Sequence, residues 1–351
     1  MDTIPPLDSI ICCQPLRSTN YHPARLGGER LPSARRKRVV KQRYYSSVTE
    51  YPFALYGAFS EARFGGCLAG IIDQATDLSV DQMLQITKEI GAPATGFITD
   101  LDQDGVSVRF FSTLTEYPMC GHVTIALMTW LTERGWFVPE IGESSKTQLR
   151  TLDKSSEVEI RLREDGRPEV LLTLAPAVFE AAVVNTAELA KMLDLSQGSF
   201  RNDLDLTVTT TDFRSLLVPI RDTADLESAN PDFAAITEWC QREQMDTVFL
   251  FAFITENAAD GIRVREFCPA VGTLESAASG TTNRAVSCYL YQTNRLGNIR
   301  NGDLVLHSEQ GNELGRPSLI TSRLSISQGQ VAAVCVGGVA TKTIEGSFLL
   351  S

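Results

Sequence analysis

Alternating apolar and polar residues mark many short segments of the chain from Tyr51 onward, and this period of two is typical of half-buried β-strands. The predicted strands include residues 51–59, 105–113, 157–164 and 247–254. Apolar residues at helical spacing predict helices at 80–90, 186–195 and 231–244. A predominance of strands, with a few helices among them, favours an α+β fold over a doubly wound parallel sheet.

The first of these helices has clear signals at both ends. Ser79 is the predicted N-cap, and Gln82 stands where the second partner of a capping box is needed. Gly91 follows the last apolar position and is the predicted stop.

The most informative feature is an internal repeat. Residues 106–135 and 262–297 both begin with a strand that contains Arg-x-Phe, and both reach a glutamate five residues before a glycine. Each segment then continues into a largely apolar helix that is closed by a glycine. The corresponding residues are Arg109 and Arg265, Phe111 and Phe267, Glu116 and Glu275, Cys120 and Ser279, Gly121 and Gly280, and His122 and Thr281. The repeat predicts two lobes of one design, related by a pseudo-twofold axis.

The helix after Gly121 is apolar on nearly every side, so we expect it to run through the centre of its lobe. Its N-terminus leaves backbone N–H groups without partners and carries about half a positive charge. Gly121 and Gly280 would let a ligand approach that backbone closely. Two such helix starts facing each other across a cleft would hold an anion, best a carboxylate. His122, in the first turn, is expected to stay neutral and to accept a proton.

Each of these features also has an ordinary structural interpretation. A buried cysteine beside a helix start, such as Cys120, is more often structural than catalytic. Glu116 and Glu275 have the alternative role of pairing with Arg109 and Arg265. The later cysteines other than Cys120 are expected to be structural, namely Cys67, Cys240, Cys268, Cys288 and Cys335.

Composition is that of a soluble globular protein, with 43% hydrophobic and 21% charged residues in a chain of 351. No apolar run reaches the roughly 18 residues of a membrane span, and the first residues lack the features of a secretory signal. We therefore expect a cytoplasmic protein without a membrane partner. The eight cysteines include no C-x-x-C pair and there are three histidines, so no metal site is predicted.

The charge distribution sets the beginning of the chain apart. The net charge is −11, yet residues 34–43 form a basic cluster, ARRKRVVKQR. An acidic body without interleaved aromatic and basic residues argues against nucleic acid as a partner. We interpret residues 1–46 as a basic leader. The remainder is predicted to form a first lobe from 47–175 with a strand near 338–351, and a second lobe from 176–337.

Several motifs in the same order resemble the PhzF-like family, of the diaminopimelate epimerase and proline racemase superfamily. They are FGGCLAGIID (64–73), VRFFSTLTEYPMCGHVTIAL (108–127), VREFCPAVGTLESAASGTT (264–282) and SEQGNELGRPSLI (308–320). The resemblance implies two similar lobes, each a curled β-sheet around a central helix, with the active site between them. It also implies a homodimer.

The chain departs from the family pattern at positions that carry chemistry. Ala94 stands at the place of the family's catalytic glutamate, and Ser276 stands at the place of an aspartate. The paired cysteines of the racemases are reduced to Cys120, opposite Ser279. His122 is retained at its matching position. The remaining candidate proton carriers are Cys120, Glu275 and Thr281, and the predicted substrate contacts are Gly66, Gly121, Ser276, Ser279, Gly280 and Thr282.

The leading hypothesis is an isomerase, independent of a cofactor, that shifts a proton and a double bond on a small unsaturated carboxylic acid. Divergent PhzF-like proteins act on pyrroline acids in antibiotic pathways that build 4-alkyl-proline units, as in lincosamides and pyrrolobenzodiazepines. By analogy, this placement would make the chain a specialised isomerase. Two alternatives remain open: a carboxylate-binding protein of the same fold without catalysis, or a racemase or dehydratase of the hydroxyproline type.

Overall fold

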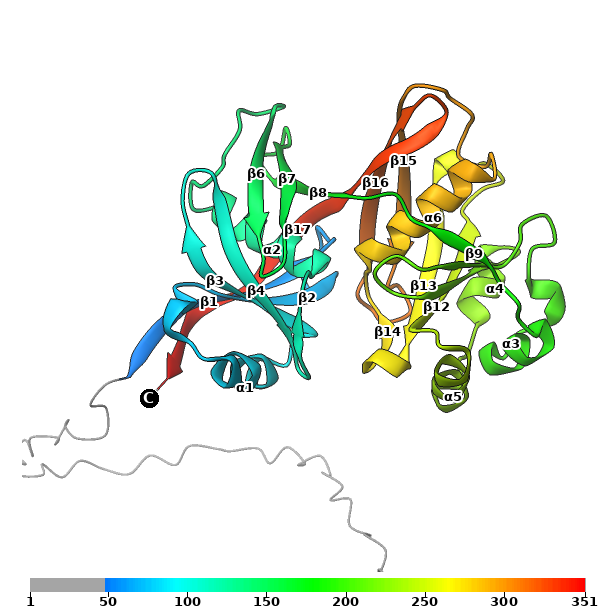
Figure 1. Cartoon of the computed structure of the whole chain (residues 1–351), viewed down its shortest axis with the longest axis horizontal. Coiled ribbons are helices and arrows are strands. Elements are labelled where there is room, and N and C mark those ends of the chain that lie inside the picture. The colour runs from blue at the N-terminus through cyan, green and yellow to red at the C-terminus, as the bar shows by residue number, and fades with distance from the viewer. Residues whose placement is uncertain (1–47, 351) are drawn as a thin grey trace, which may run out of the picture. The chain divides into compact units, whose positions relative to one another are not determined.

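The computed structural model describes residues 48–350 of the chain (Figure 1). The predicted leader and its basic cluster lie outside the described residues. The first half contains two helices, α1 (Val80–Ile90) and α2 (Gly121–Thr132). Its strands are β1 (Thr49–Ala58), β2 (Cys67–Ile72), β3 (Ala94–Leu101), β4 (Gly105–Ser112), β5 (Glu116–Tyr117), β6 (Ser144–Arg150), β7 (Ser155–Leu162) and β8 (Pro168–Leu174).

The second half contains more helices. They are α3 (Thr186–Leu193), α4 (Thr223–Ser228), α5 (Phe233–Glu243) and α6 (Gly280–Gln292). Its strands are β9 (Phe179–Ala181), β10 (Thr207–Thr209), β11 (Ser215–Pro219), β12 (Thr247–Phe253), β13 (Ile262–Cys268), β14 (Thr273–Ser276), β15 (Gly302–Gln310), β16 (Ser318–Ser327) and β17 (Gln330–Leu350). The α+β fold predicted from the sequence is confirmed.

The capping residues predicted for the first helix are confirmed. The Ser79 hydroxyl accepts a hydrogen bond from the backbone N–H of Gln82, and the Gln82 side chain accepts one from the backbone of Ser79. Gly91 ends α1 in the left-handed conformation, with φ of 70°. The predicted helices at 186–195 and 231–244 correspond to α3 and α5.

The two halves repeat the same sequence of strand pairings. In the first half, β2 pairs in parallel with β3, β3 antiparallel with β4, and β4 pairs with both β5 and β6. In the second half, β11 pairs in parallel with β12, β12 antiparallel with β13, and β13 pairs with both β14 and β15. Helix α2 follows β5, and helix α6 follows β14. The sequence repeat is therefore a repeat of the fold, which supports the two predicted lobes.

The helices α2 and α6 are the central helices of the two halves. Every residue of α2 from Val123 to Thr132 is buried, and the helix contacts β1, β2, β3, β8 and β17. Helix α6 contacts β16 and β17, and it buries Asn283 and Arg284 along with its apolar residues. The second central helix is thus less apolar than the first, because it carries a buried arginine that the first lacks.

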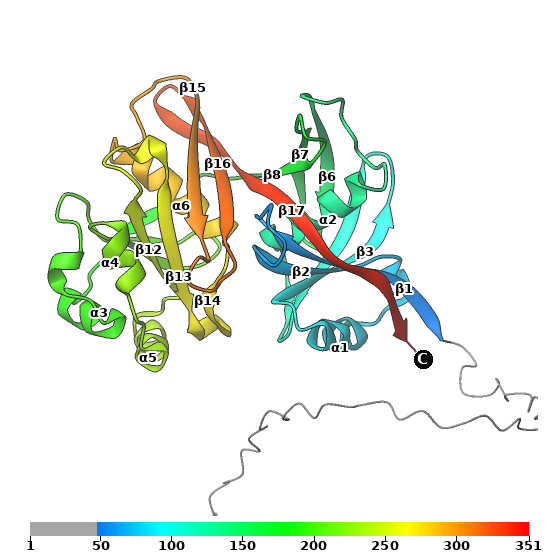
Figure 2. The same cartoon turned by 180° about the vertical axis from the view of Figure 1, so that it is seen from behind.

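Strand β17 links the two halves (Figure 2). Its first residues, from Gln330 to Gly337, pair with β16. Its last residues, from Ala340 to Leu350, pair with β1, and β8 pairs with the middle of the strand. The strand is continuous across the predicted boundary between residues 337 and 338. The position of the boundary between independent domains stays a prediction.

Candidate active site

The starts of α2 and α6 line one cavity of about 310 Å³. Their N-caps, Cys120 and Ser279, have nearly the same extended backbone, and neither side chain caps its helix. Within residues 48–350, no protein acceptor binds the backbone N–H of Gly121 or Gly280. The cavity therefore receives the unpaired amides and the positive ends of two helix dipoles, as the sequence predicts.

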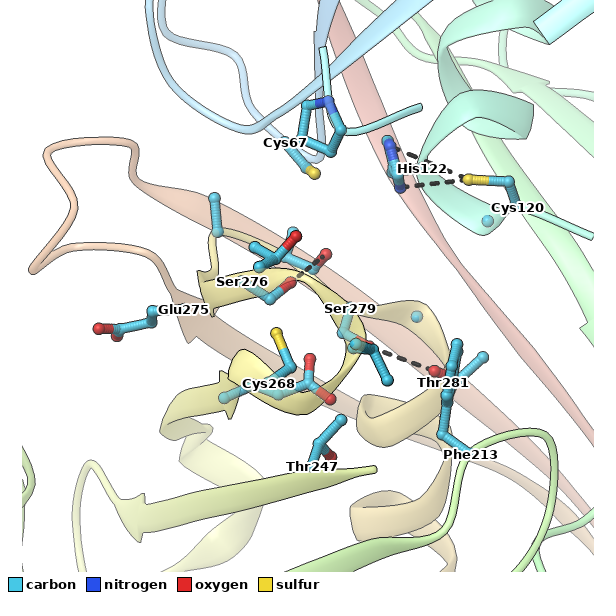
Figure 3. Close-up of a pocket in the computed structure, with 18 of the residues that line it drawn as sticks. Cys67, Cys120, His122, Phe213, Thr247, Cys268, Glu275, Ser276, Ser279 and Thr281 are labelled. Carbon is cyan, nitrogen blue, oxygen red and sulfur yellow. Dashed lines mark hydrogen bonds between the residues drawn. The ribbon is translucent and has the colours of Figure 1, made fainter. Parts of the chain in front are cut away.

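Each helix start also repeats a side-chain contact (Figure 3). The Cys120 Sγ lies 3.5 Å from the Nδ1 of His122, and the Ser279 Oγ lies 3.2 Å from the Oγ1 of Thr281. In both lobes, the N-cap side chain contacts the residue two positions later. The two contacts place a thiol and an imidazole on one side of the cavity, and two hydroxyl groups on the other.

His122 is neutral at physiological pH. Burial lowers the pKa of its imidazole to about 4, although a backbone contact with Leu68 acts in the opposite direction. The predicted neutrality agrees with this direction, and its main cause is desolvation rather than the field of the helix. A neutral imidazole in a cavity has a nitrogen that can accept a proton.

The cysteines of the cavity are protonated thiols. Burial raises the pKa of Cys120 to about 12, and it does the same for Cys67. Cys67 and Cys268 also line the cavity, and burial raises the pKa of the Cys268 thiol as well. The expectation that they are structural stays a prediction. Because thiolates are the reactive form of cysteine, none of the three is poised as a base near neutral pH.

Glu275 lines the cavity, but its carboxylate is occupied. Its two oxygens accept hydrogen bonds from the Nε and Nη2 of Arg265, each at 2.9 Å. Figure 3 shows the carboxylate pointing away from His122. Arg109 and Glu116 form the equivalent pair in the first lobe, at 2.8 and 2.7 Å. The alternative of ion pairing is confirmed for both glutamates, and Glu275 is a poor candidate for proton transfer.

Glu266 is the carboxyl group that sequence reasoning misses. It lies in β13 with 4% of its surface exposed, and it lines the cavity. Within the described part of the chain it forms no ion pair. Burial raises its pKa to about 7, although the hydroxyl groups of Ser279, Thr282 and Thr247 act to lower it. A carboxyl group with this pKa exchanges its proton near neutral pH.

The remaining predicted substrate contacts divide into two groups. Ser276 and Ser279 line the cavity together with the two glycines, whereas Gly66 and Thr282 do not. Thr281, a candidate proton carrier, also lines it. The hydroxyl of Thr282 is buried in the second lobe, near Glu266. The carbonyl of Gly66 accepts a hydrogen bond from Arg316. Gly66 therefore supports the cavity through Arg316, and substrate contact by Gly66 and Thr282 stays a prediction.

Arg316 is a cation of the cavity that sequence reasoning leaves without a role. Its Nε donates to the carbonyl of Gly66 at 2.7 Å, and its Nη2 donates to the carbonyl of Gly65 at 3.0 Å. The arginine follows β15 in the second half and the glycines precede β2 in the first. Arg316 therefore links the two halves at the cavity wall through hydrogen bonds, and its guanidinium adds positive charge to that wall.

Ala94 supplies no carboxylate to the cavity. It is 1% exposed and packs in the main hydrophobic core, while its neighbour Pro93 lines the cavity. No group of three or more potential metal-ligating side chains comes together in residues 48–350. In the same residues, the helices are too short or too polar to cross a membrane.

Known proteins share this architecture. The PhzC-PhzF family, described as phenazine biosynthesis-like protein, matches residues 56–346. An uncharacterized isomerase of Deinococcus radiodurans is 30% identical, over 86% of this chain and 96% of that protein. A trans-2,3-dihydro-3-hydroxyanthranilate isomerase of Pseudomonas chlororaphis is 26% identical, over 85% and 99%. The crystal structure of a PhzF-family phenazine biosynthesis protein of Bacillus anthracis has a TM-score of 0.76 at 20% identity, covering 86% of this chain and 100% of that one. This chain belongs to the PhzC-PhzF family of phenazine biosynthesis-like proteins.

Proposed function

We propose that the protein is an isomerase, independent of a cofactor, that moves a proton and a double bond on a small unsaturated carboxylic acid. One observation carries the proposal: the unpaired amides of two helix starts line the same cavity as a neutral histidine and a buried carboxyl group. The names of the two relatives, both isomerases, support the reaction class.

The substrate carboxylate binds at the two helix starts. The N–H groups of Gly121 and Gly280 donate to its oxygens, and the dipoles of α2 and α6 stabilise its charge. Arg316, in the cavity wall, adds a full positive charge. A cavity that excludes most water strengthens each of these interactions.

His122 and Glu266 transfer the proton. The neutral imidazole of His122 takes a proton from a carbon next to the double bond, and the electron pair of that C–H bond moves into a new double bond. The old double bond then takes a proton from the neutral carboxyl group of Glu266. After one turnover His122 is an imidazolium and Glu266 is a carboxylate, so a proton returns from His122 to Glu266 directly or through water.

The two pKa values support this division of roles. Between pH 4 and 7 the imidazole is neutral and the carboxyl group is protonated, which suits a base and an acid respectively. The reverse assignment needs an imidazolium and a carboxylate together, a pair of states that is scarce at every pH. A bound substrate carboxylate raises the pKa of Glu266 further, because two negative charges repel each other.

For the substrate we propose a pyrroline acid of the 4-alkyl-proline type, as the sequence resemblance implies. The name of the Pseudomonas relative, a dihydro-hydroxyanthranilate isomerase, supports a cyclic acid more generally. The corresponding antibiotic pathway and the homodimer also stay proposals. Light scattering on the purified protein tests the dimer.

A hydrogen-exchange measurement tests the function. The protein is incubated with a dienyl pyrroline carboxylic acid in D₂O, and deuterium in the acid is followed by NMR. We expect label at the two carbons that exchange the proton, and loss of label incorporation in His122→Ala. An acid that binds but never takes up deuterium would contradict catalysis.

The absence of the family's glutamate and aspartate favours a second candidate, a carboxylate-binding protein without catalysis. The same His122→Ala variant separates the two functions. A binding protein keeps its affinity for the acid and has no exchange to lose. An isomerase keeps most of its affinity and loses exchange by about 10²–10⁴-fold.

A further inference from the structure

A second cavity adjoins the first at the helix starts. Its volume is about 280 Å³, and it extends away from His122 and Glu266, neither of which lines it. We call it the apolar chamber, after Phe59, Ile125, Leu172, Leu174 and Val336, which line it and not the first cavity. The residues that line both cavities are Tyr117, Met119, Gly121, Phe213, Gly280 and Thr281. A ligand held at the two glycines therefore has access to both.

The chemistry of the apolar chamber favours hydrocarbon. Its aliphatic wall comes from β8, β17 and α2, and its two charged residues, Lys154 and Asp212, are both exposed. Asp212 is already paired with the buried Arg284 at 3.1 Å. An apolar cavity of about 150 Å³ holds a benzene molecule, so the chamber has room for a ring or an alkyl chain of several carbons.

Two aromatic residues of the chamber, Phe59 and Phe213, are positioned by unusual backbone conformations. Phe59 has a φ of 66°, a conformation that is strained for a bulky residue, and it is 1% exposed. Such strain costs about 1–3 kcal/mol and is found most often at functional sites. Phe213 follows Asp212, which also has a positive φ, and the buried Arg284 binds the carbonyl of Thr211 in this loop. Buried Arg284 thus fixes the loop that presents Phe213 to both cavities.

We propose that the apolar chamber binds an apolar substituent of the substrate, an alkyl chain or a small ring, while the carboxylate of the same molecule is held at Gly121 and Gly280. This inference rests on the proposed carboxylate site. It assigns the substrate to acids that carry a hydrophobic group, and it makes the chamber a determinant of specificity that is separate from proton transfer.

Calorimetric titration with butanoate, hexanoate and octanoate tests the proposal, because the three acids share a carboxylate and differ in chain length. We expect affinity to rise roughly tenfold for each added pair of methylene groups until the chamber is full. Leu174→Trp fills part of the chamber and should lower the affinity for octanoate while leaving butanoate unchanged. Leu304→Trp is the control, because Leu304 packs against the same core and lines neither cavity.

The outcomes separate this inference from the proposed function. Equal affinities for the three acids would overturn the proposed role of the apolar chamber. If all three acids also bind more weakly to Gly121→Ala, the proposed carboxylate site would still stand. Affinity that rises with length but does not change in Gly121→Ala would show that the carboxylate is not held at α2, which overturns both. An octanoate affinity that is unchanged in Leu174→Trp would also overturn the proposed role of the apolar chamber. If that variant fails to fold, the dependence of wild-type affinity on chain length still tests the proposal.

Discussion

Gly121 and Gly280 begin helices α2 and α6, and both glycines line the same two cavities. A methyl group at Gly121 would meet no other atom within 4 Å, and one at Gly280 would make only ordinary contacts with Val336 and Phe59. Neither glycine is therefore required by packing. Their lack of a side chain leaves the backbone amides open to a ligand.

Gly121→Ala is expected to weaken carboxylate binding without loss of stability. The new methyl group projects into the cavity and shields the amide, which removes a hydrogen bond to a charged group worth about 1.5–3 kcal/mol. Calorimetry with hexanoate should show a roughly 10- to 100-fold loss of affinity, and thermal unfolding should show an unchanged or higher midpoint. Gly346→Ala, also in open space and lining neither cavity, is the control. An unchanged affinity in Gly121→Ala would show that the Gly121 amide does not bind the carboxylate.

Glu266→Gln is expected to abolish the alkaline limb of the pH–rate profile. Activity needs a neutral His122 and a protonated Glu266, so the wild-type rate should fall below about pH 4 and above about pH 7. Glutamine has the same shape but no proton to donate, so turnover should drop about 10²–10⁴-fold and any residual rate should be flat across pH 7. Initial rates from pH 4 to 9 measure this. A Glu266→Gln variant with the wild-type profile would exclude Glu266 as the acid.

The same residue has a predicted effect on stability. The pKa of Glu266 is raised from 4.5 in the unfolded chain to about 7 in the fold, so the native state binds the proton more tightly. Its contribution to stability is present below pH 4.5 and is lost as the pH rises to 7. Relative to the wild type, Glu266→Gln should therefore gain roughly 2–3 kcal/mol over this interval. Urea unfolding at several pH values measures the difference. A difference that does not vary with pH would mean that the carboxyl group is ionised normally.

The two arginine–glutamate pairs should contribute different amounts to the free energy of unfolding. The side chains of Arg265 and Glu275 are 6% and 5% exposed, whereas those of Arg109 and Glu116 are 23% and 22% exposed. Glu275→Gln leaves the buried Arg265 with only the more distant Glu313, at 4.0 Å, as a counter-charge, and should cost roughly 3 kcal/mol of unfolding free energy. Glu116→Gln should cost about 1 kcal/mol or less. Denaturant unfolding compares them, and equal losses would contradict the role of burial.

Much of the architecture could be predicted from periodicity alone. The alternation of apolar residues located the strands, and the capping signals around Ser79 and Gly91 located α1, because both depend on neighbours in the chain. The repeat brought Gly121 and Gly280 together, since equivalent residues in two similar lobes occupy equivalent places. Each of these inferences rests on local chemistry or on symmetry.

The role of Glu266 could not be predicted in the same way, although a signal was present. Ile262, Val264 and Glu266 share one face of β13, and the first two are fully buried. Strand periodicity therefore placed a carboxyl group on a buried face, within the same family motif as Ser276, which pairs with Glu266 across β13 and β14. Whether Glu275 is paired could not be predicted either, because the sequence is compatible with both a free carboxylate and an ion pair with Arg265.

A crystal structure with bound hexanoate tests the central claim most directly. We predict that the carboxylate lies within hydrogen-bond distance of the backbone nitrogens at both helix starts, Gly121 and Gly280, with its alkyl chain in the apolar chamber. A carboxylate bound at one helix start alone, or on Lys154 at the surface, would contradict the account.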